Sequence, residues 1–268
     1  MTHDDLSLCR SLLFLPASNP RAIEKARTLG ADMVVLDLED AVKPVDKEMA
    51  RTAAVEAAAR GFGSSVTAIR VNSPGAWQDR DLEAVKGSAA VFAVVPRTAG
   101  RDDVDRVAAG TGKPVLAMIE TAPGVLAAAG IAPATSGLIV GTNDLGASLG
   151  LRRGSSRQAL TTALQMAVIA ARAAGVAVFD GVYNKLDDPD GFATECEEGR
   201  LFGFDGKSLI HPNQIEAANR IFSADSEEIE AARRLIEAAT GGAERFEGEM
   251  IEAMHVAQAQ KLLAKARA

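Results

Sequence analysis

Val115-Leu-Ala-Met-Ile-Glu120 and Leu138-Ile-Val-Gly-Thr-Asn-Asp144 are the two stretches that decide the predicted fold of this chain. Each is a short, continuous apolar run that closes on a carboxylate. Continuous rather than alternating hydrophobicity is typical of strands covered on both faces, as in a parallel sheet with outer helices. If the two runs are neighbouring strands of one barrel, both carboxylates emerge at the same rim. Two acids so placed would suit an octahedral Mg²⁺, so the pattern predicts a metal-dependent enzyme.

Further apolar runs recur at regular spacing along the chain. The stretches between them carry apolar positions at helical spacing, with capping residues at their starts. Eight βα units in about two hundred residues favour a (β/α)₈ TIM barrel over an open doubly wound sheet, and no GxGxxG follows the first run. The predicted strands are 11–17, 33–39, 66–72, 91–96, 115–120, 137–143, 177–183 and 204–211. The predicted helices between them include 20–29, 46–60, 101–109, 156–174 and 187–202.

The chain continues beyond what a barrel needs. We expect a TIM-barrel lyase domain over residues 8–223 and a C-terminal helical extension over 224–268. The extension contains a predicted helix at 226–239, a Gly-Gly break at 241–242 and a second helix from about 248 to 266. Two packing helices are one interpretation, and a lid or subunit-swapped arm that completes an active site is the other. The two are compatible.

Composition fits one large α/β domain, with 268 residues, 47% hydrophobic and 24% charged. A net charge of −7 and a pI near 5.1 argue against a nucleic-acid-binding or membrane-binding surface, although a local basic patch for an anionic cofactor remains compatible with it. Cys9 and Cys196 are isolated and have no metal-ligand spacing. With no secretory leader or membrane-spanning run in the sequence, the expected compartment is the cytoplasm.

Charged side chains stand at the predicted ends of most strands. Each alone has an ordinary explanation: Asp144 could cap the following segment, Glu120 could pair with Arg70, and Asp40 could lie in a solvated loop. Their convergence on one rim favours a functional site, because barrel enzymes place functional groups at the carboxyl ends of strands. The rim set comprises Asp37, Glu39, Asp40, Arg70, Asn72, Arg97, Glu120, Asn143, Asp144, Asp180, Lys207 and His211.

Six motifs stand in the order of a known family, and together they are specific although each alone is weak. The chain resembles the citrate lyase β-subunit-like proteins of the HpcH/HpaI aldolase superfamily over residues 10–223. The resemblance implies a Mg²⁺-dependent carbon–carbon lyase on a TIM barrel, assembled as a homotrimer or higher homo-oligomer. The motifs are Arg10-Ser-Leu-Leu-Phe-Leu-Pro16, Val35-Leu-Asp-Leu-Glu-Asp-Ala-Val42, Arg70-Val-Asn72, Ile119-Glu-Thr-Ala122, Gly141-Thr-Asn-Asp144 and Phe204-Asp-Gly-Lys-Ser-Leu-Ile-His-Pro212.

By this resemblance, Glu120 and Asp144 are the Mg²⁺ ligands, with water and substrate oxygens in the remaining positions. Arg70 would pair with the enolate oxygen or with a substrate carboxylate, since its planar fork stays charged and matches oxyanions. Asp37 and Glu39 would orient Arg70 or metal-bound water.

Family members that use coenzyme A imply a second group of residues. Arg21, Lys25 and Lys207 are the candidates for contacts with the phosphates of coenzyme A. For Arg21 and Lys25 the alternative is an ordinary solvated helix face. Lys207 could instead form a Schiff base, but its neighbours Asp205 and His211 supply no apolar pocket that would lower its pKa, so the metal mechanism is favoured.

Two departures from the family pattern bear on the substrate. Arg97 stands where many relatives have lysine, which keeps the charge and changes its geometry. The tail reads Phe246-Glu-Gly-Glu-Met-Ile-Glu252 where relatives tend to have Leu-Asp-Gly-Lys-Met-Ile-Asp, with the first aspartate contributed to a neighbour's site. Glu247 would replace that aspartate with a carboxylate one methylene further out, so a role as base or in thioester hydrolysis does not transfer directly.

The leading hypothesis is cleavage of a citryl, malyl or citramalyl thioester, carried by coenzyme A or an acyl carrier, to an oxo acid and an acyl thioester. One alternative is a Mg²⁺-dependent 2-oxo acid aldolase that acts on free acids. Another is a lyase-complex subunit that docks an acyl-carrier protein.

Overall fold

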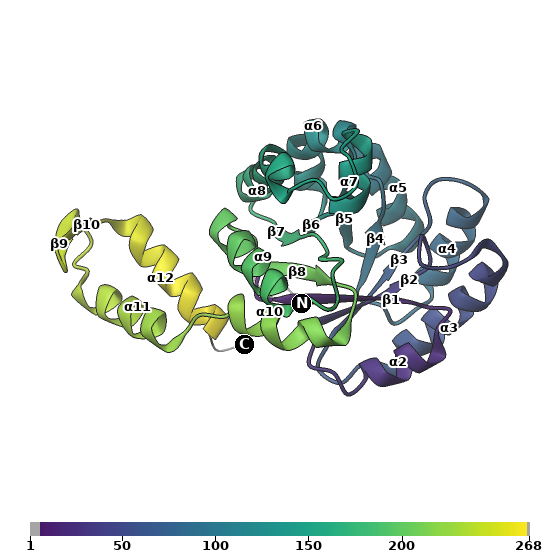
Figure 1. The fold of residues 1–268 in the computed structure, drawn as a ribbon, viewed down its shortest axis with the longest axis horizontal. Helices are drawn as coiled ribbons and strands as arrows, with labels where there is room; N and C mark the ends of the chain where they lie inside the picture. Colours follow the sequence, from purple (N-terminus) through teal and green to yellow (C-terminus); the bar gives the residue numbers. More distant parts are fainter. Residues whose placement is uncertain (1–5, 267–268) are drawn as a thin grey trace. The chain divides into compact units, whose positions relative to one another are not determined.

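A closed barrel of eight parallel strands is the central feature of the computed structural model, which describes residues 6–266 (Figure 1). The strands run around the barrel in chain order, and β8 pairs with β1 in the register Ser11↔Lys207. The predicted (β/α)₈ TIM barrel is thereby confirmed. The strands are β1 (Ser11–Pro16), β2 (Met33–Asp37), β3 (Val66–Arg70), β4 (Phe92–Val95), β5 (Val115–Ile119), β6 (Gly137–Val140), β7 (Ala177–Asp180) and β8 (Gly206–Leu209).

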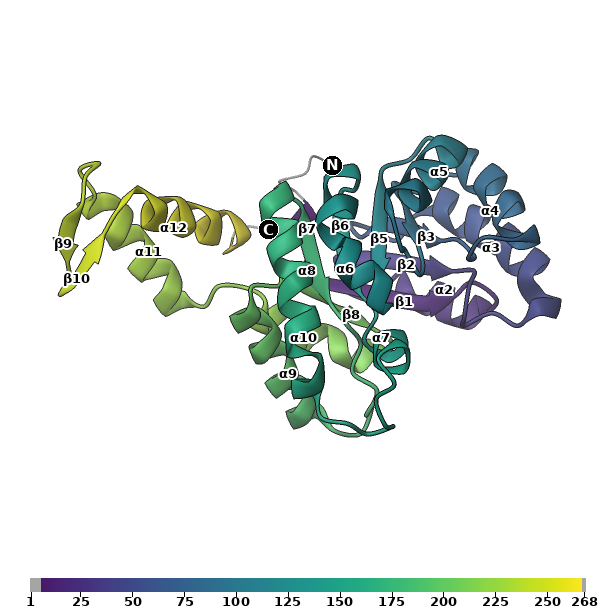
Figure 2. The same ribbon diagram turned by 90° about the horizontal axis from the view of Figure 1, so that it is seen from above.

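Helices follow the strands and surround the barrel (Figures 1 and 2). Their starts carry the expected caps: Asn19 accepts the Ala22 N–H at 3.1 Å, and Asp188 accepts the Gly191 N–H at 3.0 Å. These helices are α2 (Pro20–Ala26), α3 (Lys47–Arg60), α4 (Ala76–Lys86), α5 (Arg101–Thr111), α6 (Ala122–Ile131), α7 (Thr142–Ser148), α8 (Thr161–Ala174), α9 (Pro189–Phe202) and α10 (Ile215–Ile221). Short 3₁₀ turns lie at η1 (Pro44–Asp46), η2 (Ala132–Ala134), η3 (Arg157–Leu160) and η4 (Pro212–Gln214).

The barrel interior is a packed apolar core. All residues of β2, β4, β5 and β6 are buried, as expected for strands covered on both faces. Side chains that point inward from successive strands form one cluster, and this cluster is the floor beneath the rim. Its members on the strands are Leu12, Met33, Val35, Ala68, Phe92, Val94, Leu116, Met118, Ile139, Ala177 and Phe179.

The strands end earlier than the sequence predicted, so that some polar rim residues close a strand and others lie just beyond one. Strand β6 stops at Val140, so Asp144 does not close a strand but lies in the first turn of α7. The Leu145 N–H donates to the Gly141 carbonyl at 3.0 Å and begins the helix there. Asp37 and Arg70 thus end their strands, whereas Glu39, Glu120 and Asp144 occupy loops and a helix start above the barrel, where backbone can bend toward a ligand.

The structure divides into two compact units, Met1–Asn219 and Arg220–Ala268. In the second unit, α11 (Ser226–Ala238) and α12 (Ala253–Ala266) pack side by side, and a hairpin of β9 (Glu244–Phe246) and β10 (Glu249–Ile251) joins them (Figure 1). The predicted start of the last helix, at about residue 248, was wrong, because α12 begins at Ala253. Glu247 and Gly248 form a two-residue hairpin turn, and their φ angles of 48° and 95° are incompatible with an α-helix.

No helix among residues 6–266 is both long and apolar enough to cross a bilayer.

Candidate active site

Glu120 and Asp144 lie beside each other at the carboxyl rim. Glu120 follows β5 directly and is 2% exposed, whereas Asp144 sits at the start of α7 with its side chain 34% exposed. Gly141 makes room for the pair, because a Cβ at that position would overlap Oε2 of Glu120. One buried and one accessible carboxylate therefore face the same space.

Burial dominates the electrostatics of Glu120. Loss of solvent raises the pKa of its carboxyl to about 7, and the charge of Asp144 acts in the same direction. Two groups oppose this shift: the Arg97 N–H, which donates to Oε1 at 2.6 Å, and the Arg70 guanidinium. A cation bound between the two acids would relieve the remaining cost of the buried charge.

Arg70 is held in place by two acids, Asp37 at the end of β2 and Glu39 in the loop that follows. The ladder pairs Asp37 with Arg70 directly, and Nε and Nη2 each donate to the Asp37 carboxylate at 2.7 Å. Glu39 adds an ion pair at 3.2 Å, and its own pKa is raised to about 7, chiefly by burial. Nη1 faces Met118 Sδ at 3.6 Å. Since a thioether is a weak acceptor, this N–H remains available to a stronger one.

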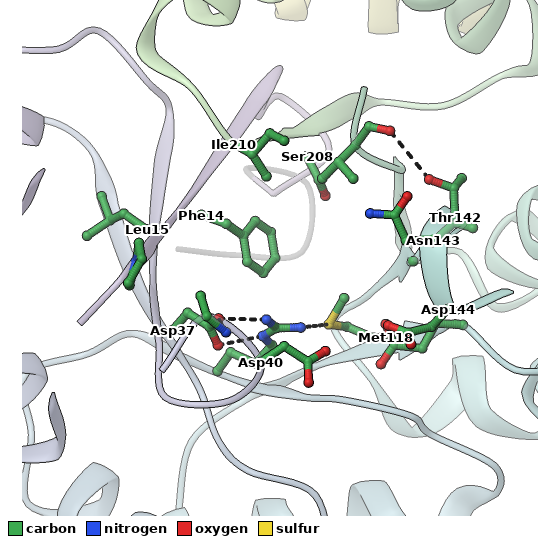
Figure 3. Close-up of a pocket in the computed structure, with 17 residues that line it drawn as sticks. Phe14, Leu15, Asp37, Asp40, Met118, Thr142, Asn143, Asp144, Ser208 and Ile210 are labelled. Atoms are coloured by element: carbon green, nitrogen blue, oxygen red, sulfur yellow. Dashed lines mark hydrogen bonds and ion pairs between the residues drawn. The ribbon is translucent and has the colours of Figure 1, made fainter. Parts of the chain in front are cut away.

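One cavity of about 410 Å³ is lined by Asp37, Arg70, Met118, Glu120 and Asp144 (Figure 3). The Arg70 guanidinium contacts Asp37 and Met118 and lies 5.5 Å from the centroid of the Phe14 ring. Figure 3 shows Asp144 on the far side of Met118 from Asp37. The predicted residues Asp37, Arg70, Glu120 and Asp144 are thus brought together. The lining also includes residues that the sequence did not single out, among them Phe14, Leu15, Met118, Thr142, Val182, Ser208 and Ile210.

The acids of this cavity fit Mg²⁺. Within residues 6–266 no group of three or more His, Cys, Asp or Glu side chains is arranged to hold a metal, so a site at Glu120 and Asp144 would supply two protein ligands. Mg²⁺ commonly binds through one or two carboxylates and keeps water or substrate oxygens in its other positions. An open cavity beside two carboxylates matches that requirement.

A buried polar network supports the loop after β2, which carries Glu39 and directly follows Asp37. Lys47 Nζ donates at 2.6 Å to the carbonyls of Leu38 and Glu39 and to the side chain of Asn72. Burial lowers the pKa of Lys47. Asp81, which is fully buried, accepts the N–H and side-chain amide of the same Asn72. Sequence reasoning missed this support, because Lys47 and Asp81 lie in helices where a charged residue ordinarily faces water.

Lys207 is not placed to contact phosphates, and this part of the prediction was wrong. It is fully buried, and its Nζ donates to Asp180 at 2.7 Å and to Glu195 at 2.8 Å. Burial alone would lower the pKa of Lys207, but these carboxylates raise it. Asp180 also pairs with Arg157 at 2.9 Å. The cluster joins β7, β8 and α9, and its lysine is neither a free cation nor a nucleophile.

The remaining predicted residues lie outside this cavity. Arg21 and Lys25 are exposed on α2, which follows β1 at the carboxyl rim. Glu247 is exposed at the hairpin turn of the second unit, where it forms an ion pair with Arg234 at 3.0 Å. Their predicted roles stay predictions.

A closed parallel barrel with acids and an anchored arginine at its carboxyl rim defines a TIM-barrel enzyme. A model of the HpcH/HpaI aldolase/citrate lyase family matches residues 10–212. The chain belongs to this family, and the predicted membership and enzyme class are confirmed.

Curated relatives and solved structures match over almost the whole chain. A (3S)-malyl-CoA thioesterase of Cereibacter sphaeroides is 44% identical, covering 97% of this chain and 95% of that protein. The citrate lyase subunit beta of Escherichia coli is 31% identical over 96% and 93%, respectively. A crystal structure of CitE from Mycobacterium tuberculosis with magnesium, acetoacetate and coenzyme A superposes with a TM-score of 0.83 at 33% identity, covering 97% of this chain and 98% of that one.

Proposed function

We propose that this protein is a Mg²⁺-dependent carbon–carbon lyase that cleaves a malyl-, citramalyl- or citryl-type thioester to an oxo acid and an acyl thioester. The observation that carries the proposal is the convergence of Glu120, Asp144 and Arg70 on one cavity at the rim of a family barrel. Similarity to proteins described with magnesium, coenzyme A and oxaloacetate supports the choice of ion and substrate class.

The bond to be broken explains the need for these groups. In a malyl-type thioester the hydroxyl loses its proton, and its oxygen becomes the carbonyl of the oxo acid. The carbon–carbon bond breaks, and its electron pair forms the enolate of the acyl thioester, which is then protonated on carbon. Mg²⁺, when bound by Glu120 and Asp144, would supply Lewis-acid polarisation of the hydroxyl and carboxylate oxygens.

Arg70 supplies fixed positive charge for the developing anion. Its guanidinium is buried and clamped by Asp37 and Glu39, so no reorganisation is needed when the enolate oxygen gains charge. Its N–H toward Met118 can be given over to the substrate at little cost. Asp37 and Glu39 thus act by positioning Arg70.

Roles are also proposed for exposed residues outside the cavity and for the C-terminal extension. The exposed Arg21 and Lys25 on α2 are proposed to contact the phosphates of coenzyme A. We further propose that the extension over 224–268 is a lid or arm that brings Glu247 to the site of a neighbour, in a homotrimer or higher oligomer of the cytoplasm.

Thioester hydrolysis is the second candidate, because the relative with 44% identity is a (3S)-malyl-CoA thioesterase. Here water attacks the thioester carbonyl, the carbon–sulfur bond breaks, and malate and free coenzyme A leave. The two reactions share a substrate and differ in products. With malyl-CoA, the lyase releases glyoxylate and acetyl-CoA, whereas the thioesterase releases a free thiol.

The deciding experiment supplies purified protein with Mg²⁺ and a panel of malyl-, citramalyl- and citryl-CoA, the same acyl groups on an acyl carrier, and free hydroxy-oxo acids. It measures oxo acid and free thiol in parallel. Oxo acid without free thiol supports the lyase, and free thiol without oxo acid supports the thioesterase. Turnover of free hydroxy-oxo acids alone would favour the aldolase alternative, and turnover of carrier-bound substrate alone would favour the acyl-carrier subunit. Turnover that is unchanged both by removal of Mg²⁺ and by Glu120→Ala would contradict the metal-dependent proposals.

A further inference from the structure

Arg97 contacts both acids of the proposed metal site from a backbone conformation that arginine rarely adopts. It follows β4 and Pro96 with φ of 49°, in the left-handed region where side chains other than glycine are strained. Its N–H donates to Glu120 Oε1 at 2.6 Å, while its Nη1 lies 3.6 Å from Asp144 Oδ1. One residue therefore binds one acid through its backbone and the other through its side chain.

The presence of an arginine here points to a role for the side chain. Glycine would adopt the same φ without strain and would still present the N–H to Glu120. The backbone contact thus needs no side chain. What the arginine adds is a cation beside Asp144, and the side chain of Arg97 is 52% exposed.

We infer that Arg97 is a positioning residue that acts as a resident counter-ion of the metal-binding acids. Its N–H fixes one oxygen of Glu120, and its guanidinium neutralises Asp144 until Mg²⁺ displaces it. The side chain therefore competes with the ion and weakens its binding. The inference rests on the proposed metal site, because it assumes that Glu120 and Asp144 are the ligands.

Mg²⁺ titration of the purified, metal-free full-length protein by calorimetry tests the inference without reference to activity. Arg97→Gly keeps the N–H and removes the competing charge, so we expect about threefold to tenfold tighter Mg²⁺ binding. Arg97→Lys restores a cation and should restore affinity to within about twofold of wild type. Arg101→Ala removes an equal charge from the exposed start of α5 and serves as the matched control with unchanged affinity.

Thermal unfolding of the metal-free variants tests the backbone part. Arg97→Gly should melt at a higher temperature than Arg97→Ala, because the left-handed φ strains alanine and does not strain glycine. A lower melting temperature for Arg97→Gly than for Arg97→Ala would contradict the claim that the backbone at this position is strained. If Arg97→Gly binds Mg²⁺ as tightly as wild type or more weakly, the proposed role of Arg97 as a counter-ion is wrong. Glu120→Gln distinguishes failure of the proposed metal site from failure of the proposed role of Arg97. If this variant binds Mg²⁺ as wild type does, the assignment of the metal site is wrong. If it loses Mg²⁺ while Arg97→Gly is unchanged, only the present inference fails.

Discussion

Glu120 shows how a single side chain can be made ready for a metal ion. Its carboxylate is buried, accepts one backbone N–H, and keeps its second oxygen against the bare backbone of Gly141. Burial disfavours the ionised form and raises the pKa to about 7. The proton and the metal ion therefore compete for the same group near neutral pH.

Mg²⁺ binding is accordingly expected to depend on pH. Because the pKa of Glu120 is raised, the acid is protonated below pH 7 and ionised above it, so affinity should fall by up to about tenfold per pH unit below 7 and level off above 8. Calorimetry in buffers of different ionisation enthalpy would detect the proton released at pH 6. Glu120→Gln is the control, with weak binding at every pH. A Mg²⁺ affinity that does not change between pH 5.5 and pH 8 would contradict the expectation.

At the scale of elements, the start of α3 fixes the loop after β2. Lys47 reaches from the first turn of that helix to two loop carbonyls and to Asn72, which lies just after β3. The loop carries Glu39 and directly follows Asp37, and both acids hold Arg70. The position of Arg70 therefore depends indirectly on Lys47. A helix that covers the barrel thereby also orders its rim.

Lys47→Met should destabilise the fold and disturb the site together. The change leaves two buried carbonyls and Asn72 without their charged donor, at a cost of about 2–4 kcal/mol in the free energy of unfolding. Urea unfolding measures this cost. Lys43→Met, at an exposed position four residues earlier, is the matched control and should change stability by less than about 0.5 kcal/mol. Equal stability of the two variants would show that the network is not needed.

The buried cluster of β7, β8 and α9 should respond to acid. Burial alone would raise the pKa of Asp180, but Lys207 and Arg157 hold it below its usual value, so its stabilisation is present above about pH 4 and is lost as pH falls through the lowered pKa. Asp180→Asn should cost about 3–5 kcal/mol at pH 7, since it leaves buried cations underpaired.

Urea unfolding at pH 7 and pH 3 measures this difference. The difference in the free energy of unfolding between wild type and Asp180→Asn should be smaller at pH 3 than at pH 7. The exposed Asp187→Asn supplies the control with little change at either pH. A gap that stays constant between the two pH values would contradict the role of ionised Asp180.

At the scale of the whole molecule, the barrel forms one compact unit and the last helices with their hairpin form another. The cavity is lined by residues of the first unit, and Glu247 belongs to the second. A barrel closed on itself leaves no sheet edge for assembly, so the extension is the natural candidate for a part shared between subunits.

Mixed oligomers test whether the extension is shared. Glu120→Gln and Glu247→Ala proteins are each expected to be nearly inactive. If a site combines the barrel of one subunit with the arm of another, refolding an equal mixture should restore about a quarter of wild-type activity, because random pairing joins an intact barrel to an intact arm in that proportion. No restoration, with both variants still oligomeric, would mean that each arm serves its own barrel or none.

Several parts of the site could be predicted from the sequence because they depend on local pattern. Apolar runs locate β5 and β6, and a parallel barrel brings the residues after its strands to one rim, so the sequence alone suffices to group Glu120, Asp144, Arg70 and Asp37. The hairpin at Glu247 escaped prediction, because a three-residue strand carries almost no periodicity and a glutamate is an unusual first residue for such a turn.

The sequence by itself determined the barrel, its family and the acids of the rim, since strand periodicity and strand-end chemistry are local properties of the chain. Tertiary structure decided which charges are partnered. Lys207 and Asp180 look like rim groups in the sequence and prove to neutralise each other in the protein interior, whereas Lys47 looks solvated and proves to hold the active-site loop. The physical reason is that burial and charge pairing arise between segments far apart in the chain, and only their packing fixes the distances on which both depend.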